Sequence, residues 1–217
     1  VVVAVDRSIG FENYLIVSNR PNPIDLPQPS NSPSSTRLVY VGDIRESRGL
    51  SAMLRLVQEN PEIGLDLVGP CVDEASLYQQ IEELDLSDRV VWHGRCSYER
   101  SWEIASHCLA GLSLLSPTPS FWEAVPTKLW EYWAVGLPVL ATSIPGQGKV
   151  IQDAKGGVIG SHGELLEILD VWISNPEEAK KIGSQGREYF FKSASDNDKQ
   201  ISDAVEKAMS VYKVKTQ

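Results

Sequence analysis

The segment FWEAVPTKLWEYWAVGLPVLAT, residues 121–142, holds two glutamates and a lysine at a spacing that could bind a charged ligand. Proline disfavours a helical residue before it, so Glu123 is predicted on a loop before Pro126, whereas Glu131 falls inside the helix that follows. Free N–H groups of the first helical turn and the Lys128 ammonium favour an anion such as a diphosphate, and carboxylates on either side could accept hydrogen bonds from hydroxyl groups. The alternative is an ordinary helix surface on which Lys128 and Glu131 pair at i, i+3. The spacing alone leaves the two interpretations equal.

Short apolar runs alternate with amphipathic stretches on both sides of this segment. Strands are predicted at 38–42, 63–69, 89–94, 109–115, 137–142 and 156–160, and helices near 49–57, 77–84, 98–108 and 126–136. Strands that alternate with helices of about ten residues predict a doubly wound α/β domain, Rossmann-like, with a parallel sheet covered on both faces. Ligands bind such sheets beyond the carboxyl ends of the strands, which is where the loop with Glu123 is expected.

The two ends of the chain differ from this central pattern. Residues 1–20 contain two short apolar runs and are expected to be the remnant of a preceding domain, and residues 19–36, rich in proline and serine, to be an interdomain linker. The folded domain is predicted at 37–190 and a C-terminal helix at 191–217. Because the chain starts with Val1 rather than Met and lacks the basic region of a signal peptide, we expect it to be cut from a longer protein.

The C-terminal quarter is predicted to be mainly helical. Apolar stripes occur at 165–172, 176–191 and 196–212. A DxD triplet, Asp196-Asn197-Asp198, is predicted to open the last of these helices, and a solvated first turn is favoured there over a metal site.

Composition and charge exclude several classes of protein. The 42% hydrophobic and 23% charged residues are ordinary for a globular domain and exclude disorder. A net charge of −9 disfavours nucleic acid as a partner, so an anionic ligand would need a local cluster of donors. No apolar run approaches the roughly 18 residues of a membrane span, so no transmembrane segment is expected in this chain and a cytoplasmic location is predicted.

Familiar nucleotide and metal motifs do not fit this sequence. The dinucleotide fingerprint would need glycine at Ile151, and the Walker pattern lacks its first glycine at Ser143. The three cysteines have no CxxC spacing and are predicted to be small buried residues without a disulfide or a metal. His93 and His107 have no nucleophile-elbow context, so structural roles are favoured for both.

Three segments together resemble the group 1 glycosyl transferases, retaining enzymes of GT-B fold also called family 4. Residues 40–50, YVGDIRESRGL, resemble the first donor-domain segment of that family, and 89–94, RVVWHG, the strand before its base-binding loop. The EX7E region of one subgroup, written PTKLxEYxAxGxPV, stands here as Glu123, Pro126-Thr127-Lys128-Leu129, Glu131-Tyr132, Ala134, Gly136 and Pro138-Val139. The resemblance covers residues 38 to about 190.

The resemblance implies a role for each matching residue. Glu131 would accept hydrogen bonds from the ribose of the donor, and Glu123 would hold the hydroxyls of the transferred sugar. Lys128 and Arg48 would neutralise the departing diphosphate, so the implied catalytic residues are Glu123, Lys128 and Arg48. The other implied donor contacts are Gly42, where the backbone approaches the ligand, Arg45, a substitute for the basic residue that the family has in place of Asp43, Cys96 and Ser97 near the base, and Pro126 and Thr127 at the helix start.

The resemblance also implies a reaction and a second domain. A glycosyl group, of hexosyl type, would move from a nucleotide diphosphate sugar to a hydroxyl with retention, and neither a metal nor another cofactor is implied. This chain would be the C-terminal, donor-binding half of a GT-B enzyme, whose partner is the N-terminal acceptor domain of the same polypeptide. Alone it would bind a nucleotide sugar weakly and transfer nothing, and association of the full-length enzyme with a membrane surface stays open. The alternatives are another GT-B enzyme such as a nucleotide-sugar epimerase, or a non-catalytic α/β interaction domain.

Three tryptophans accompany the EX7E segment. Trp122, Trp130 and Trp133 are predicted to be core or domain-interface residues rather than platforms that stack on a sugar. Any that are exposed would mark the surface that the N-terminal domain covers.

Overall fold

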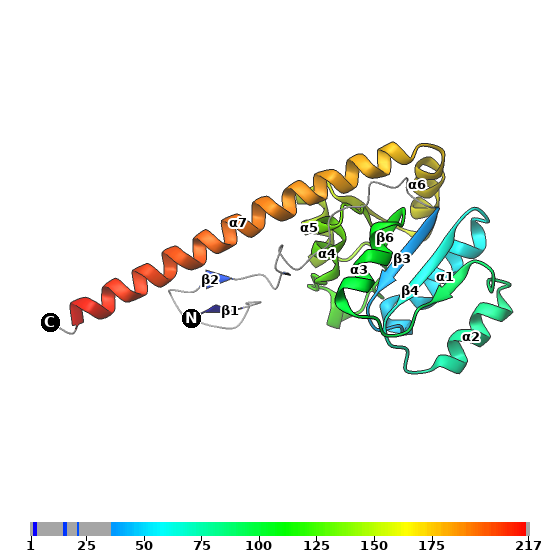
Figure 1. Ribbon diagram of the computed structural model, residues 1–217, viewed down its shortest axis with the longest axis horizontal. Helices are drawn as coiled ribbons and strands as arrows, with labels where there is room; N and C mark the ends of the chain where they lie inside the picture. Colours follow the sequence, from blue (N-terminus) through cyan, green and yellow to red (C-terminus); the bar gives the residue numbers. More distant parts are fainter. Residues whose placement is uncertain (1, 4–14, 17–20, 22–35, 216–217) are drawn as a thin grey trace.

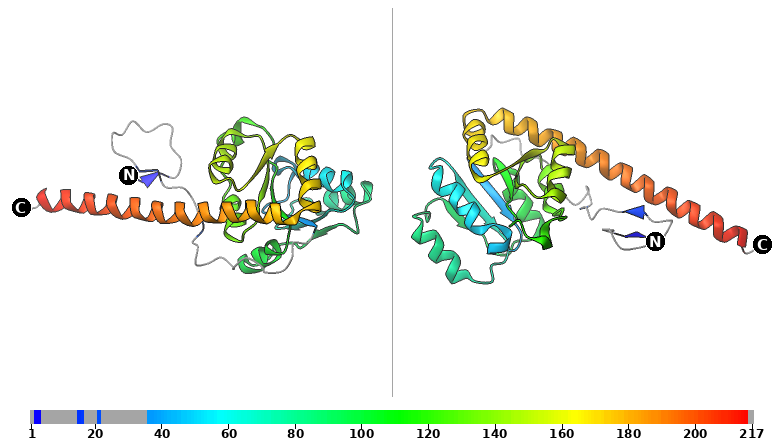
Figure 2. Two further views of the ribbon diagram at one scale, coloured as in Figure 1. Left: turned by 90° about the horizontal axis from the view of Figure 1, so that it is seen from above. Right: turned by 180° about the vertical axis from the view of Figure 1, so that it is seen from behind.

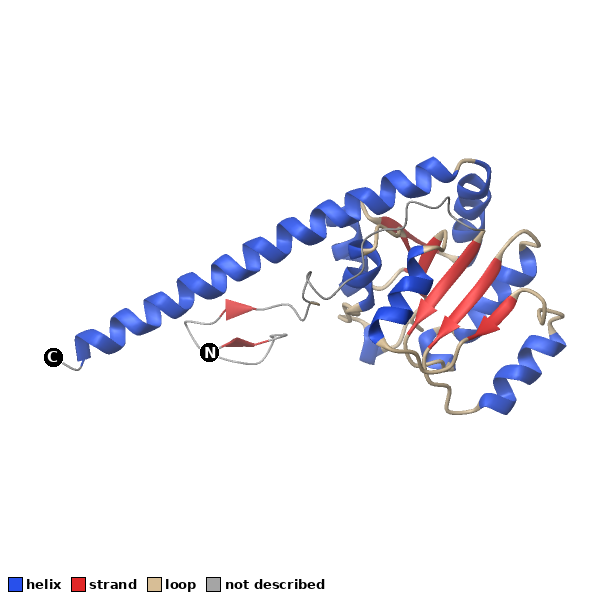
Figure 3. Ribbon diagram, viewed as in Figure 1, coloured by secondary structure: helices blue, strands red, loops and turns tan. Residues whose placement is uncertain are grey.

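Within the described part of the chain, six parallel strands form the central sheet in the order β5-β4-β3-β6-β7-β8 (Figures 1 and 3). The strands are β3 Arg37–Val41, β4 Gly64–Val68, β5 Val90–Trp92, β6 Ala110–Ser113, β7 Val139–Thr142 and β8 Gly157–Gly160. The computed structural model describes residues 2–3, 15–16, 21 and 36–215. Each of these strands begins and ends within two residues of its predicted limits, and the doubly wound α/β class is confirmed.

Helices cover both faces of this sheet (Figure 2). The apolar side chains of α1 (Leu50–Glu59), α2 (Glu74–Glu83) and α6 (His162–Ser174) belong to one buried core, and those of α3 (Tyr98–Ser106), α4 (Lys128–Ala134) and α5 (Pro145–Ala154) belong to the other. Strand β4 is buried along its whole length, as expected for a strand covered on both sides. Helix α5 is not predicted from the sequence, because its two glycines, Gly146 and Gly148, weaken the helical pattern.

The direction of winding reverses between β3 and β6. From β3 the chain moves outward through β4 to β5, then returns to the other side of β3 and moves outward again through β6, β7 and β8. The two central strands pair in parallel, with Leu38 opposite Ala110 and Val39 opposite Gly111. In this class of fold the loops that follow two such strands turn to opposite faces, and ligands usually bind between them, at the carboxyl ends of the strands. This place is called the crevice below.

The longest helix, α7 (Pro176–Lys215), has 40 residues and continues far beyond the sheet (Figures 1 and 2). Two separate helices are predicted here, so the expectation that Asp196-Asn197-Asp198 opens a helix is wrong: the triplet lies within α7. Nothing interrupts the helix, because residues 187–215 contain neither glycine nor proline. The predicted boundary at 191 likewise falls inside it.

The first turns of α7 pack closely against α4, because two of their residues are glycines. A Cβ atom at Gly183 would lie 2.0 Å from the carbonyl oxygen of Gly136, and one at Gly186 would lie 2.3 Å from Cδ1 of Trp133. The indole of Trp133 is fully buried in this contact and donates a hydrogen bond of 2.8 Å to the Gly156 carbonyl. Helix α7 therefore fixes the helix that carries Lys128.

Little of the N-terminal region is described. Two-residue strands β1 (Val2–Val3) and β2 (Leu15–Ile16) pair in parallel, and β2 contacts α7. The rest of the predicted remnant at 1–20, and the predicted linker at 19–36 apart from its residues 21 and 36, lie outside the described residues. None of the described helices combines the length and the apolar character that a membrane span requires.

Candidate functional site

Gly42 directly follows β3 and has no side chain that would cover its backbone. Its φ of +142° is a conformation that other residues rarely adopt, and a Cβ atom there would lie 3.1 Å from Nζ of Lys128. Gly69, after β4, has a φ of +139°, and its Cβ would lie 2.1 Å from the Gly42 carbonyl oxygen. Both turns require glycine, and they bring the backbone at the end of β3 close to the backbone after β4 and to the Lys128 ammonium.

Lys128 places a positively charged group beside the Gly42 backbone. It is the first residue of α4, and its ammonium lies 3.6 Å from the centroid of the Tyr40 ring. The pKa of Lys128 is lowered to about 7, first by burial and then by the positive charge of Arg48. The carboxylates of Glu131 and Asp43 act in the opposite direction without restoring the usual value. Charge is therefore costly here, and an incoming anion would relieve that cost.

Arg48 provides a second cation from the other side of the crevice. It ends the short 3-10 helix η2 (Glu46–Arg48), and its guanidinium lies 4.9 Å from the centroid of the Phe121 ring. Phe121 belongs to the loop after β6, in the 3-10 helix η3 (Pro119–Phe121). Gly49, the residue after Arg48, has a φ of +92°, and a Cβ there would lie 2.0 Å from the Leu114 carbonyl oxygen. The loops after the two central strands are thus packed against each other.

Glu131, one turn after Lys128, is half-buried and has a defined orientation. Its Oε1 accepts a hydrogen bond of 3.1 Å from the hydroxyl of Tyr98, the first residue of α3. Burial raises the pKa of the Glu131 carboxyl, whereas the Tyr98 hydrogen bond and the Lys128 charge lower it. The two residues are 33 positions apart, so no local pattern in the sequence predicts that Tyr98 belongs to the site.

Glu123 lies on an exposed turn between η3 and α4. Its backbone is fixed by α5: the Gly146 N–H donates a 3.0 Å hydrogen bond to the Trp122 carbonyl, and a Cβ at Gly146 would lie 2.4 Å from the carbonyl carbon of Glu123. Trp130 and Trp133 are buried, which agrees with the prediction that they are core or domain-interface residues. Trp122 is 51% exposed and belongs to neither core, and its place at an interface stays a prediction.

The helix that carries the two functional side chains starts later than predicted. Pro126 and Thr127 precede it, because α4 begins at Lys128 rather than at Pro126. The Pro126 carbonyl accepts a hydrogen bond of 3.1 Å from the Leu129 N–H, which gives the start a 3-10 turn. Thr127 has helical φ and ψ but makes no side-chain cap. Both residues lie directly before the helix that carries Lys128, and their contact with a donor stays a prediction.

Three other predicted donor contacts have partners within the protein. Arg45 forms an ion pair with the Asp43 carboxylate, and its predicted contact with a donor stays a prediction. Ser97 caps α3 by accepting a 3.2 Å hydrogen bond from the Arg100 N–H. Cys96 is half-buried, and its thiol lies 3.7 Å from the His93 carbonyl oxygen. These contacts give Ser97 and Cys96 structural roles beside the site.

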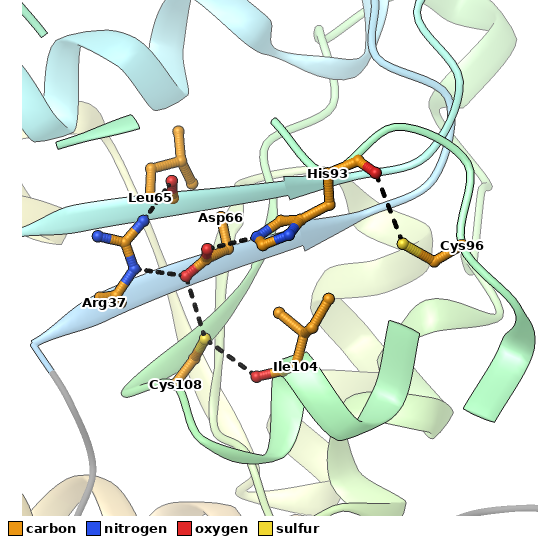
Figure 4. A network of polar contacts seen from close by, with 7 residues as sticks. All are labelled: Arg37, Leu65, Asp66, His93, Cys96, Ile104 and Cys108. Atoms are coloured by element: carbon orange, nitrogen blue, oxygen red, sulfur yellow. Dashed lines mark hydrogen bonds and ion pairs between the residues drawn. The ribbon is translucent and has the colours of Figure 1, made fainter. Parts of the chain in front are cut away.

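Asp66, in the middle of β4, is the centre of a polar network beside the loop 93–97 (Figure 4). Its carboxylate accepts a 2.6 Å hydrogen bond from Nε of Arg37 and lies 2.7 Å from Nε2 of His93, which agrees with the structural role predicted for His93. The buried thiol of Cys108 lies 3.8 Å from the same carboxylate, and burial raises its pKa well above the usual range. Nothing around Asp66 in the sequence predicts this network, because its partners are distant in the chain: Arg37 lies on β3, His93 follows β5 and Cys108 follows α3.

The cysteines differ in their burial and form no disulfide. All three cysteines are free, as predicted, but only Cys108 is buried. Within the residues that the structure describes, no group of three or more histidine, cysteine or acidic residues has the arrangement of a metal site.

A doubly wound parallel sheet covered by helices on both faces defines a Rossmann-like domain of the kind found in GT-B enzymes. The chain belongs to the family of group 1 glycosyl transferases, whose family model matches residues 25–189. It is therefore a glycosyltransferase domain, and the predicted family is confirmed.

Similar proteins agree with this family and with the fold. The chain is 27% identical over 197 residues to the lipopolysaccharide 1,6-galactosyltransferase of Escherichia coli K12, covering 86% of this chain and 54% of that enzyme. Anabaena HepE in complex with UDP and glucose has a TM-score of 0.74 at 17% identity, over 89% of this chain and 56% of that one. The C-terminal domain of LpcC from Francisella tularensis, a group 1 glycosyl transferase, has a TM-score of 0.58 at 17% identity, over 74% of this chain and 92% of that one. The chain thus spans about half the length of the galactosyltransferase.

Proposed function

We propose that this chain is the donor-binding half of a retaining glycosyltransferase, which moves a hexosyl group from a nucleoside diphosphate sugar to a hydroxyl acceptor. The observation that carries the proposal is the content of the crevice at the switch point. Lys128, whose ammonium lies 3.6 Å from the Tyr40 ring centroid, faces the bare backbone of Gly42, and Glu131 follows one turn later. This combination suits a diphosphate joined to a ribose.

In this proposal the diphosphate lies between Lys128 and Arg48, which enter from loops on opposite sides of the crevice. When the bond between the sugar and the diphosphate breaks, negative charge develops on the leaving group, and preorganised cations stabilise it. The ribose hydroxyls donate to the Glu131 carboxylate. The hydroxyls of the transferred sugar donate to Glu123, whose turn lies between η3 and α4 in the connection from β6.

We further propose that the two cations supply the charge that a divalent metal provides in other sugar transferases, so that the donor is bound without a metal or another cofactor. Arg48 is held by its contact with the Phe121 ring, and Lys128 by its contact with the Tyr40 ring. Both cations are therefore positioned by aromatic rings, which leave their N–H groups available to phosphate oxygens.

The acceptor side is proposed to come from an N-terminal domain of the same polypeptide, since the chain spans 54% of the similar galactosyltransferase. We expect this chain alone to bind the donor and to transfer no sugar. We also propose a cytoplasmic location, where nucleotide sugars are available. Release of free sugar or formation of a glycoside by the chain alone would contradict the part of the proposal that concerns its inactivity.

The proposal is tested by ligand-observed NMR on the chain with UDP, GDP and ADP and their common sugar conjugates. We expect saturation transfer to the ribose and base of one nucleotide, and its loss in Glu131→Gln. The matched control is Glu83→Gln, because Glu83 also lies on a helix and accepts a side-chain hydrogen bond, of 2.7 Å from Gln79, but at α2, on the opposite face of the sheet. Absence of transfer from every nucleotide at millimolar concentration, or equal transfer in both variants, would overturn the donor-site assignment.

A further inference from the structure

The hydroxyl of Tyr98 and the carboxylate of Glu131 form a contact that joins two loops of the crevice. Tyr98 begins α3, directly after the loop 93–97, and its hydroxyl donates a 3.1 Å hydrogen bond to Oε1 of Glu131 on α4. The Tyr98 side chain is 38% exposed, so its hydroxyl lies at the surface of the crevice rather than in the core. A ligand bound to Glu131 would meet this pair.

The position of Tyr98 is set by aromatic rings beneath it. Its ring meets that of Trp102 edge to face, with centroids 6.1 Å apart, and Trp102 meets Tyr132 in the same way at 5.5 Å. Trp102 and Tyr132 are buried, and the Tyr132 hydroxyl accepts a 3.0 Å hydrogen bond from the Val41 N–H at the end of β3. These three rings, each edge to face with the next, thus connect Tyr98 to the central strand β3.

The start of α3 is also fixed. The Ser97 side chain caps the helix. The backbone carbonyl of Ser97 accepts hydrogen bonds from both the N–H and the hydroxyl of Ser101, at 3.0 and 2.8 Å. The backbone of Tyr98 is therefore held as firmly as its ring. The Tyr98 hydroxyl has a defined place from which it can orient a partner.

We propose that Tyr98 is a positioning residue that orients the Glu131 carboxylate so that it recognises the ribose 2′-hydroxyl of the donor. This inference rests on the proposed function, in which Glu131 accepts hydrogen bonds from the ribose. A carboxylate has about four acceptor positions on its two oxygens, and two neighbouring hydroxyls are bound well only when its plane is fixed. Tyr98 occupies one position on Oε1, which holds that plane and leaves Oε2 for the ligand. Without Tyr98, the Glu131 side chain regains its rotational freedom.

The test compares affinities for a ribonucleoside diphosphate and its 2′-deoxy form, using UDP, GDP or ADP, whichever binds the chain, by isothermal titration calorimetry. The unmodified protein should prefer the ribo form roughly tenfold, as expected for a hydrogen bond to a charged acceptor. In Tyr98→Phe the ratio should fall at least about threefold, because the ribo form binds more weakly while the 2′-deoxy form changes less than about twofold. Glu131→Gln should bring the ratio close to one, and adding Tyr98→Phe to it should change nothing further.

Controls separate positioning from a merely structural role. Tyr78→Phe is the matched variant, because Tyr78 is also exposed and also packs edge to face on a tryptophan, Trp92, at 5.9 Å, but it lies on α2. It should leave the ratio unchanged. If Tyr98→Phe lowers the melting temperature, Glu131→Asp provides a second measurement, because it withdraws the carboxylate from an intact Tyr98 and should lower the ratio as well.

The outcomes distinguish this inference from the proposed function. An unchanged ratio in Tyr98→Phe, or equal weakening of both nucleotides, would overturn the positioning role while the donor site stands. A ratio that Glu131→Gln leaves unchanged would show that Glu131 does not bind the ribose, and the inference would fall with it. If no nucleoside diphosphate binds the unmodified chain, the proposed function and the positioning role both fail.

Discussion

The two glutamates of the crevice, Glu131 and Glu123, lie in different environments. Glu131 is half-buried on a helix that α7 holds from behind, it accepts the Tyr98 hydroxyl, and its pKa is raised by burial. Glu123 is exposed on a turn, beside a tryptophan that is 51% exposed. The domain itself prepares one carboxylate, whereas the other is presented to whatever enters the crevice. Under the proposed function, the nucleotide would therefore meet a carboxylate that the protein already orients, and the sugar would meet a carboxylate on an exposed turn.

The side of the crevice that carries Glu131 depends on tight packing between α7 and the end of α4. A Cβ atom at Gly183 would meet the backbone of Gly136 at 2.0 Å, so α7 can approach the end of α4 only where it lacks a side chain. On the other side, a tight contact at Gly146 fixes the backbone of Glu123, whose side chain lies exposed on its turn. Four changes, taken from the largest expected effect to the smallest, test whether these two sides differ as described.

Gly183→Ala should have the largest effect, because the new methyl group must displace either α7 or the Gly136 carbonyl. Overpacking of this kind costs about 2 kcal/mol of the free energy of unfolding, which denaturant titration measures. Gly163→Ala is the matched control: Gly163 also lies in a helix, but nothing is within 4 Å of its Cβ position, so stability should stay equal or rise by about 0.5 kcal/mol. Equal stability of both variants would mean that α4 is not held by α7.

Lys128→Met should weaken binding of a nucleoside diphosphate sugar roughly tenfold at pH 6, where the lysine of the free protein is charged. Its pKa of about 7 lies below the usual value, so the lysine loses its proton as pH rises through 7, and a bound diphosphate must then recover that proton from solution. The affinity of the unmodified protein should therefore fall between pH 7 and pH 9 and approach that of the variant.

The proton itself can be counted. Calorimetry at pH 8 in buffers of different ionisation enthalpy should show uptake of nearly one proton per donor bound by the unmodified protein, because the pKa of Lys128 in the free protein is about 7. Lys128→Arg should show none, because a guanidinium stays charged throughout this range. A loss of affinity in Lys128→Met that is the same at pH 6 and pH 9 would show that the lysine is not the titrating group.

Glu123→Gln sharpens the comparison, because it should affect only one class of ligand. Binding of the nucleoside diphosphate alone should change less than about twofold, whereas binding of its sugar conjugate should weaken by about three- to tenfold as hydroxyl groups lose a charged acceptor. The unconjugated nucleotide serves as the internal control in the same titration series. If both ligands weaken equally, Glu123 belongs to the nucleotide side and the two carboxylates do not divide the donor between them.

The difference between the two sides also explains what the sequence could predict. The strands and the helix after Pro126 follow from local patterns, because period, proline and glycine act over a few residues, whereas the interpretation of residues 123–131 as an EX7E segment comes from the resemblance to a family. The contact of Tyr98 with Glu131 does not, because it depends on how α3 and α4 lie over the sheet. The ion pair of Arg45 with Asp43 is local, yet the resemblance to a family pattern directs Arg45 to the ligand instead. The continuity of α7 follows from the lack of a helix breaker after residue 186, a local signal that the separate apolar stripes obscure.

Trp122→Ala should have the smallest effect. Its side chain is 51% exposed and belongs to neither core, while its carbonyl, which accepts the Gly146 N–H, is kept by alanine. The free energy of unfolding should change by less than about 0.5 kcal/mol, as is usual at a surface position, whereas Trp133→Ala should cost about 3 kcal/mol or more from the core. Nucleoside diphosphate binding should be unchanged in Trp122→Ala. A large loss of stability would mean that the turn bearing Glu123 is packed like the helix bearing Glu131, and the contrast between a prepared and an exposed carboxylate would no longer hold.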